Sequence, residues 1–310
     1  MASVTLTESA KLAQDELVAG VIENIITVNR FYEVLPFDGI EGNSLAYNRE
    51  NVLGDVTLSG VGDTFTGLGA GKAAATFTNV NSNLTTIMGD AEVNGLIQAT
   101  RSGDGNDQTA VQIASKAKSA GRKYQDQMIN GTGAGNETTG LISLCAAGQK
   151  VATGANGGAL SFEFLDELMD LVTDKDGVVD YITMHARTLR SYRTLLRGLG
   201  GASVNEVVEL PGGGEVPAYS GVGIFRNDYI PTDQVKGTGS AQTTIFAGTF
   251  DDGSRSQGIA GLTASKASGI QIVDVGEAED ADEHIWRVKW YCGLALFSEK
   301  GLSCAEGITN

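Results

Sequence analysis

The sequence predicts a mixed α+β fold, and three observations lead to this prediction. Residues 107–131 form the longest stretch with helical periodicity in the chain. Shorter segments alternate apolar and polar residues as strands do, most clearly over residues 285–292. Glycine is abundant, with 42 glycines against 4 prolines, which indicates many turns and strand ends rather than a helical bundle.

The composition limits the classes of protein to consider. A length of 310 residues allows one large domain or two. With 22 basic and 38 acidic residues, the net charge of −16 argues against nucleic-acid binding through a broad basic face, although a container with an acidic wall remains open. No secretory signal and no run of ~20 apolar residues is present. Cys145, Cys292 and Cys304 lack metal-ligand spacing and are expected to be reduced thiols of a cytoplasmic product.

The N-terminal segment is expected to form an amphipathic arm. Thr5 and Glu8 fit a capping box, and apolar residues then follow at helical spacing as far as Ile25. The alternative is an ordinary first helix of a globular domain. Residues 31–37 (FYEVLPF) are predicted to be a short strand or bridge.

Residues 42–84 form an insertion that is poor in large apolar side chains. Strand signals at 45–47 and 76–78 flank a glycine-rich tip, so the segment is predicted to be a long hairpin. A lone hairpin is only marginally stable in water, so another surface is expected to complete it. A neighbouring copy of the chain is a natural candidate, and a plain flexible loop is the alternative.

The helix predicted over residues 107–131 has a face of small and apolar side chains suited to packing on a sheet. Asp107 favours its start, and Asn130-Gly131 is a stop signal. A glycine-rich turn and a short apolar strand are expected to follow, up to residue 144. The apolar face consists of Ala110, Ile113, Ala114, Ala117, Ala120, Tyr124 and Met128.

The second half of the chain is predicted to begin with helices and to end with strands. Ser161 is an N-cap signal for a helix at 162–172, residues 178–184 form a buried-strand candidate, and residues 186–197 form a second helix. Arginines 190, 193 and 197 share one face of that helix, either as a solvated face or as a subunit contact. Strands are expected from residue 215 onward, ending with a long strand that starts near 285.

Catalytic, cofactor and metal motifs are not found. His185 and His284 lie far apart in sequence, and no HExxH or CxxC pattern occurs. The tip sequence TGLGAGKA departs from a phosphate-binding loop at Thr66 and Ala73. No catalytic, cofactor-binding or metal-binding residue is therefore assigned, and the chain is expected not to be an enzyme.

The order of these segments resembles the major capsid proteins of tailed bacteriophages, whose Hong-Kong-type capsid fold is shared with encapsulins. Five segments carry the resemblance: NGTGAGNETTGL, VVDYITMHARTLRSYRTLLRG, AYSGVGIFRNDYIP, TIFAGTFDDG and WRVKWYCGLALFSEKGLSCAEGI. It implies an arm at 1–34, an E-loop hairpin at 35–84, a peripheral domain at 85–154 with a spine helix at 107–130, an axial domain at 155–283, and a return strand to the peripheral domain at 284–310.

The resemblance implies a structural subunit that self-assembles into hexamers and pentamers of an icosahedral shell around the phage double-stranded DNA. It further implies assembly in the host cytoplasm, no sequence-specific DNA binding, no cofactor, no membrane, and scaffolding, portal and decoration proteins as candidate partners. One alternative is an encapsulin-type nanocompartment, and another is a soluble α+β enzyme with a glycine-rich lid loop. The intersubunit-contact candidates are Lys72, Lys116, Arg122, Lys123, Arg190, Arg193 and Arg197.

Overall fold

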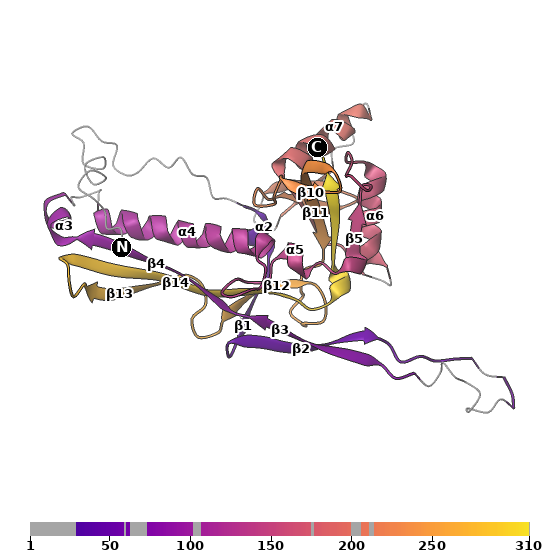
Figure 1. Cartoon of the computed structure of the whole chain (residues 1–310), viewed down its shortest axis with the longest axis horizontal. Helices are drawn as coiled ribbons and strands as arrows, with labels where there is room; N and C mark the ends of the chain where they lie inside the picture. Colours follow the sequence, from indigo (N-terminus) through magenta and orange to yellow (C-terminus); the bar gives the residue numbers. More distant parts are fainter. Residues whose placement is uncertain are drawn as a thin grey trace.

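The computed structural model describes residues 29–58, 60–62, 73–101, 107–174, 177–199, 206–210 and 214–309. The predicted N-terminal arm helix, most of the glycine-rich tip and Lys72 lie outside these residues. The described chain has an elongated body built on a five-stranded sheet and a second body built on an eight-stranded sheet. A two-stranded hairpin extends away from both bodies (Figure 1).

The elongated body pairs segments from opposite ends of the sequence. Its strand order is β1 (Phe37–Ile40), β12 (Ile259–Ala264), β14 (Glu283–Leu296) and β13 (Gln271–Glu277), and β4 (Thr85–Asn94) pairs with β14. The helix α3 (Gly95–Arg101) follows β4, and α4 (Gln108–Asn130) runs along β4 and β14 (Figure 1). The long strand predicted near residue 285 is confirmed as β14, whereas β12 had no clear signal in the sequence.

The helix α4 confirms the helix predicted over 107–130. The Asp107 carboxylate caps it by accepting a hydrogen bond of 2.9 Å from the backbone N–H of Thr109. Ala120, Tyr124 and Met128 are buried as expected, but Ala110 and Ala114 are exposed, so the expected apolar face is wrong in the first half of the helix. In the sheet, α4 contacts β4 and β14.

Close backbone contact explains the glycines after α4. A Cβ atom on Gly131 would lie 2.1 Å from the carbonyl oxygen of Thr138, and one on Gly140 would lie 2.7 Å from the backbone nitrogen of Gly131. The turn therefore closes on itself, and the Gly140 N–H donates to the Gly131 carbonyl at 2.8 Å. The strand predicted after this turn is wrong, because residues Leu141–Leu144 form the short helix α5.

The eight-stranded sheet carries two helices on one face. The strand order is β5 (Lys150–Ala152), β15 (Leu302–Ile308), β11 (Gly239–Gly248), β6 (Tyr181–Met184), β9 (Val222–Arg226), β8 (Glu215–Tyr219) and β7 (Val207–Glu209), with β10 (Gln234–Lys236) paired to β11. The helices predicted at 162–172 and 186–197 are confirmed as α6 (Phe162–Thr173) and α7 (Ala186–Gly198), and Ser161 caps α6 as expected. The short 3-10 helices η3 (Ala147–Gln149) and η5 (Glu299–Gly301) precede β5 and β15.

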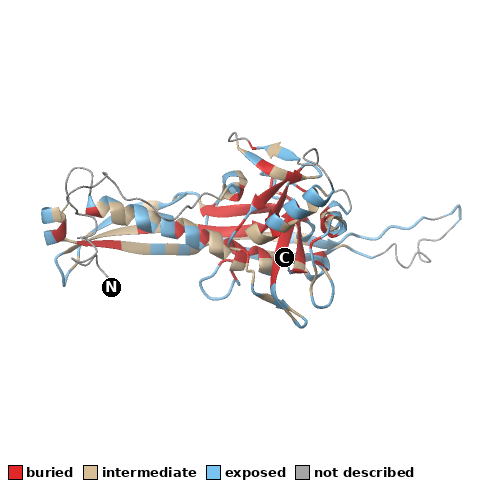
Figure 2. Cartoon of the chain, turned by 90° about the horizontal axis from the view of Figure 1, so that it is seen from above, coloured by how far each residue is buried: buried red, intermediate tan, exposed pale blue. Residues whose placement is uncertain are grey.

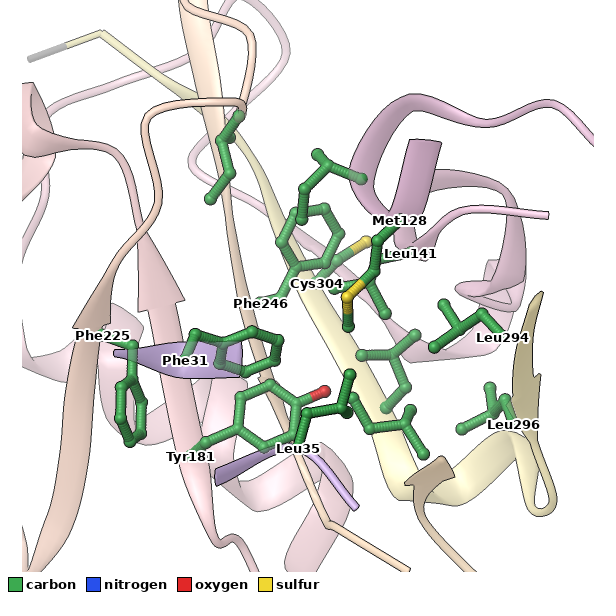
Figure 3. Packing of buried hydrophobic residues seen from close by; sticks show 14 of the residues in the cluster. Phe31, Leu35, Met128, Leu141, Tyr181, Phe225, Phe246, Leu294, Leu296 and Cys304 are labelled. Atoms are coloured by element: carbon green, nitrogen blue, oxygen red, sulfur yellow. The ribbon is translucent and has the colours of Figure 1, made fainter. Parts of the chain in front are cut away.

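A shared hydrophobic core joins the two bodies, and Figure 3 shows part of it. Phe31 lies at the centre of this core. Its ring centroid is 5.1 Å from that of Tyr181 and 5.7 Å from that of Phe225. Phe31 belongs to the short helix α2 (Phe31–Val34), so the strand predicted for this segment is wrong. One helical turn places the aromatic side chain in the core, and this packing overrides the β preference of FYEV.

The strands of the two sheets do not follow the domain boundaries that the resemblance implied. The strands β12 and β13 fall within 155–283 but belong to the five-stranded sheet, and β15 falls within 284–310 but belongs to the eight-stranded sheet. The chain therefore passes between the bodies several times. Among the described residues, no helix is long and apolar enough to cross a membrane.

Candidate assembly surfaces

The hairpin of β2 (Ser44–Val52) and β3 (Thr76–Asn83) confirms the paired strands predicted over 42–84. Its register pairs Tyr47 with Val80 and Glu50 with Phe77. The strands extend away from the rest of the chain, and most of their surface is exposed (Figure 2). The lid of the enzyme alternative would instead have to cover a site on its own domain.

Apolar side chains become more exposed toward the far end of the hairpin. Leu53 is 74% exposed, Val56 is 88% exposed and Leu58 is 100% exposed. Phe77, on the opposite strand, is 65% exposed. Each apolar side chain is stabilised when it leaves water, by roughly 1.5–3 kcal/mol for complete burial of a large one. The far end of the hairpin therefore has the chemistry of a contact surface, and the described residues of its own chain leave it exposed.

Two polar side chains attach the root of the hairpin to the chain's own β14. The Tyr47 hydroxyl donates to the Leu296 carbonyl at 2.7 Å, and the Arg49 Nε donates to the Phe297 carbonyl at 3.0 Å. Arg49 also forms an ion pair with Glu299 at 2.8 Å. Sequence analysis missed this attachment, although the spacing of two puts Tyr47 and Arg49 on the same face of a strand.

The basic candidates on α4 are exposed but differ in their partners. The Lys123 ammonium pairs with Asp126 at 3.2 Å, and the Arg122 Nε donates to the Tyr229 hydroxyl at 3.1 Å. Lys116 lies beside β4, where it contributes to the lowered pKa of Asp90, although the main cause is hydrogen bonding from Arg287. Part of the charge on this helix is therefore already engaged within the subunit.

The arginine stripe on α7 is free of ion pairs within the described part of the chain. Arg190, Arg193 and Arg197 are all exposed on the helix, and none appears in a salt bridge among these residues. Arg187, at the edge of the stripe, instead donates to the Ala241 carbonyl at 2.8 Å. The acidic chain thus presents three exposed guanidinium groups on one helix face, and none of them has an ion-pair partner among the described residues.

An open cavity of about 640 Å³ brings two of the candidates together. Arg122 of α4 and Arg193 of α7 both line it, although they are far apart in sequence. Arg30 and Arg226 line it as well, and sequence analysis missed both. Arg226 pairs with Asp228, and Arg30 donates to the Glu215 carbonyl at 2.6 Å. Four arginines from separate parts of the sequence therefore line this one hollow.

The two histidines have structural partners. The His185 Nδ1 accepts a hydrogen bond from the Arg187 N–H at 3.0 Å and caps α7, and burial lowers the pKa of this imidazole. His284 lies 2.7 Å from an Asp274 carboxylate oxygen across the β13–β14 pair. No group of three or more potential metal ligands occurs in the described residues.

Comparison with known proteins agrees with this geometry. A family model described as SU10 major capsid protein matches residues 64–214, while no curated protein matches the chain. The SrpI encapsulin of Synechococcus elongatus PCC 7942 is similar at a TM-score of 0.74 with 17% identity, over 99% of this chain and 97% of that chain. The capsid protein of cyanophage A-1(L) is similar at a TM-score of 0.72 with 10% identity, over 99% of this chain and 100% of that chain.

The capsid of a native GTA particle is similar as well, at a TM-score of 0.64 with 14% identity over 98% of both chains. These similarities show that the chain has the Hong-Kong-type capsid fold, which confirms the fold that the resemblance implied. The match to the SU10 major capsid protein model further supports a role as the structural subunit of a capsid shell.

Proposed function

We propose that this chain is the major capsid protein of a tailed bacteriophage and forms an icosahedral shell around double-stranded DNA. The observation that carries the proposal is the β2–β3 hairpin, whose far end exposes Leu53, Val56 and Leu58 to water. A monomer gains nothing from this exposure, whereas a neighbour that covers the hairpin stabilises the assembly. The match to the SU10 major capsid protein model supports the phage assignment.

The two bodies take the roles of the two shell domains in this proposal. The five-stranded sheet with α4 corresponds to a peripheral domain, in which α4 is the spine helix. The eight-stranded sheet with α6 and α7 corresponds to an axial domain near the centre of each hexamer or pentamer. The hairpin corresponds to the E-loop.

The hairpin of one subunit lies across the exposed face of α4 in its neighbour. Charge complementarity supports this placement: Glu50 and Asp55 are exposed on the hairpin, and Lys116, Arg122 and Lys123 are exposed on the helix. Individual exposed ion pairs contribute at most about 1 kcal/mol, so they orient the contact while apolar burial provides most of its stability. Lys72, which lies outside the described residues, remains a contact candidate.

The protein acts structurally rather than as an enzyme, and it requires no cofactor or membrane. Assembly takes place in the host cytoplasm, and the finished subunit resides in the virion capsid. The shell holds DNA without sequence-specific contacts, as a net charge of −16 favours. Scaffolding, portal and decoration proteins are the further partners.

Negative-stain electron microscopy of the purified chain tests the proposal directly. We expect closed shells, or rings of five and six subunits, at protein concentrations where a monomer would appear only as small particles. Sedimentation of a folded monomer over the whole concentration range, with no rings, would contradict it.

An encapsulin-type compartment is the second candidate, because the similarity to the SrpI encapsulin has a TM-score of 0.74. Particles isolated from the native source distinguish the two functions. Packaged double-stranded DNA, recognised by nuclease-protected absorbance at 260 nm and by sequencing, supports the capsid. A stoichiometric second protein without DNA supports the compartment.

A further inference from the structure

The outward face of α6 is acidic and matches the basic stripe of α7 in length and spacing. The carboxylates of Glu163, Asp166, Glu167 and Asp170 follow the helical steps i, i+3, i+4 and i+7, and all four residues are exposed. The guanidinium groups of the α7 stripe follow the steps i, i+3 and i+7. Each stripe therefore covers two turns of helix, or about 10 Å.

The two helices cover opposite ends of one sheet face. The α6 helix lies toward the β5 end, where the Ser303 hydroxyl of β15 donates to the Leu168 carbonyl at 2.9 Å. The α7 helix lies toward the β7 end, where the Tyr192 hydroxyl donates to the Ala218 carbonyl of β8 at 2.8 Å. Both helices bury their apolar sides in the same core cluster, so their charged sides point away from it.

The acidic and basic stripes do not neutralise each other inside the subunit. No salt bridge joins α6 to α7 among the described residues. The aromatic rings of Phe162, Tyr192 and Tyr219 pack between the two helices and occupy the space between them. Asp166 accepts a hydrogen bond of 2.6 Å from the Tyr219 hydroxyl. The carboxylates of Glu163, Glu167 and Asp170 have no such partner within the described part of the chain.

We propose that the basic stripe of α7 in one subunit binds the acidic stripe of α6 in the next subunit of the same ring. This inference rests on the proposed shell function and names the partner surface of the arginine stripe. A contact between two different faces of identical chains is heterologous, and such contacts form a closed ring when the rotation between neighbours closes. The placement of the two stripes at opposite ends of one layer is the arrangement that such a ring requires.

Charge reversal on each helix tests the contact. The first variant carries Arg190→Glu, Arg193→Glu and Arg197→Glu, and the second carries Glu163→Lys, Glu167→Lys and Asp170→Lys. Each variant alone sets like charges against each other, so we expect ring assembly to weaken at least about a hundredfold. A third variant with all six changes restores opposite charges and should assemble again.

Mixing the first two variants gives a second and independent readout. The first variant carries acidic groups on both helices, and the second carries basic groups on both. Opposite charges therefore meet only where the two variants alternate around the ring, so the mixture should form rings with an even number of subunits. Rings of six should appear by native mass spectrometry, and rings of five should be absent. Circular dichroism and thermal unfolding establish that each variant is folded, and reversal of the exposed charges of Lys266 and Glu41, on neither helix, should leave assembly unchanged.

The outcomes separate this contact from the function on which it rests. Normal assembly of either single-helix variant would overturn the contact and leave the shell function standing, with the stripes as solvated faces or sites for another protein. Failure of the folded six-change variant to assemble would also overturn it. A wild-type chain that never assembles would overturn the shell function and the contact together.

Discussion

Arg49 of the hairpin and Phe297, the residue that follows β14, are joined by a hydrogen bond of 3.0 Å from the arginine Nε to the backbone carbonyl oxygen. The bond fixes where the hairpin leaves the body, although 248 residues separate the two positions. Because the same guanidinium also pairs with Glu299, one side chain determines much of the direction of the hairpin.

We expect Arg49→Met to loosen the hairpin and leave the two bodies folded. Methionine keeps most of the aliphatic length but removes a charge-assisted hydrogen bond, which typically contributes ~1.5–3 kcal/mol. Hydrogen exchange should accelerate in β2 and β3 but stay unchanged in β11, and assembly should fall. The control is Asn48→Ala, on the opposite face of β2, where the side chain accepts a hydrogen bond of 3.0 Å from Asn79 within the hairpin. Equal exchange rates in Arg49→Met and the wild type would contradict this role.

Removal of the far end of the hairpin should give folded subunits that do not assemble. The Asp55 N–H donates to the Ala73 carbonyl at 3.1 Å, so the two strands are still adjacent at this point. Residues 55–74 can therefore be replaced by Asn-Gly, which favours a two-residue hairpin turn. We expect an unchanged thermal unfolding midpoint for the monomer and no rings in negative stain. Loss of folding would instead show that the segment belongs to a local core.

The turn after α4 should tolerate no side chain at Gly131. A Cβ atom there would lie 2.1 Å from the Thr138 carbonyl oxygen, so Gly131→Ala requires a backbone shift and should destabilise the chain by roughly 1–3 kcal/mol in urea unfolding. The control is Gly121→Ala within α4, where, apart from the adjoining helix backbone, no described atom lies within 4 Å of the added Cβ. That change should stabilise the helix by ~0.5–1 kcal/mol. Equal effects of the two changes would contradict the steric argument.

The sequence predicted correctly those helices and strands that are specified by residues close together in the chain. The capped helices α4 and α6 and the alternating strand β14 were found because cap residues and periodicity specify them. The segments of α2 and α5 were predicted to be strands, because their shape depends on partners distant in sequence, as Phe31 depends on Tyr181 and Phe225. The cavity lined by Arg122 and Arg193 could not be predicted from the sequence either, because it exists only where the two bodies meet.

Burial of Cys292 makes an alkaline loss of stability expected. Desolvation raises the pKa of this thiol to about 12 in the folded chain, whereas an unfolded chain releases the proton near the ordinary value of 9.0. The folded state therefore retains the proton over a pH range in which the unfolded state has lost it. The resulting stability is complete below pH ~9 and is lost as the pH rises toward the folded pKa.

The free energy of unfolding should accordingly fall by up to ~1.4 kcal/mol per pH unit above pH 9 on account of Cys292. Urea unfolding at pH 8, 9, 9.5 and 10 measures this slope. The buried tyrosines, which titrate at about pH 10 in an unfolded chain, add to the slope equally in the wild type and in the matched variant, so the difference between the two slopes reports Cys292. The matched variant is Cys292→Ala, which lowers stability at every pH because it leaves a small cavity. Its slope above pH 9 should be shallower than that of the wild type, since Cys304 is the remaining thiol with a raised pKa. Parallel slopes in the two proteins would mean that Cys292 titrates alike in the folded and the unfolded chain, and would contradict the raised pKa.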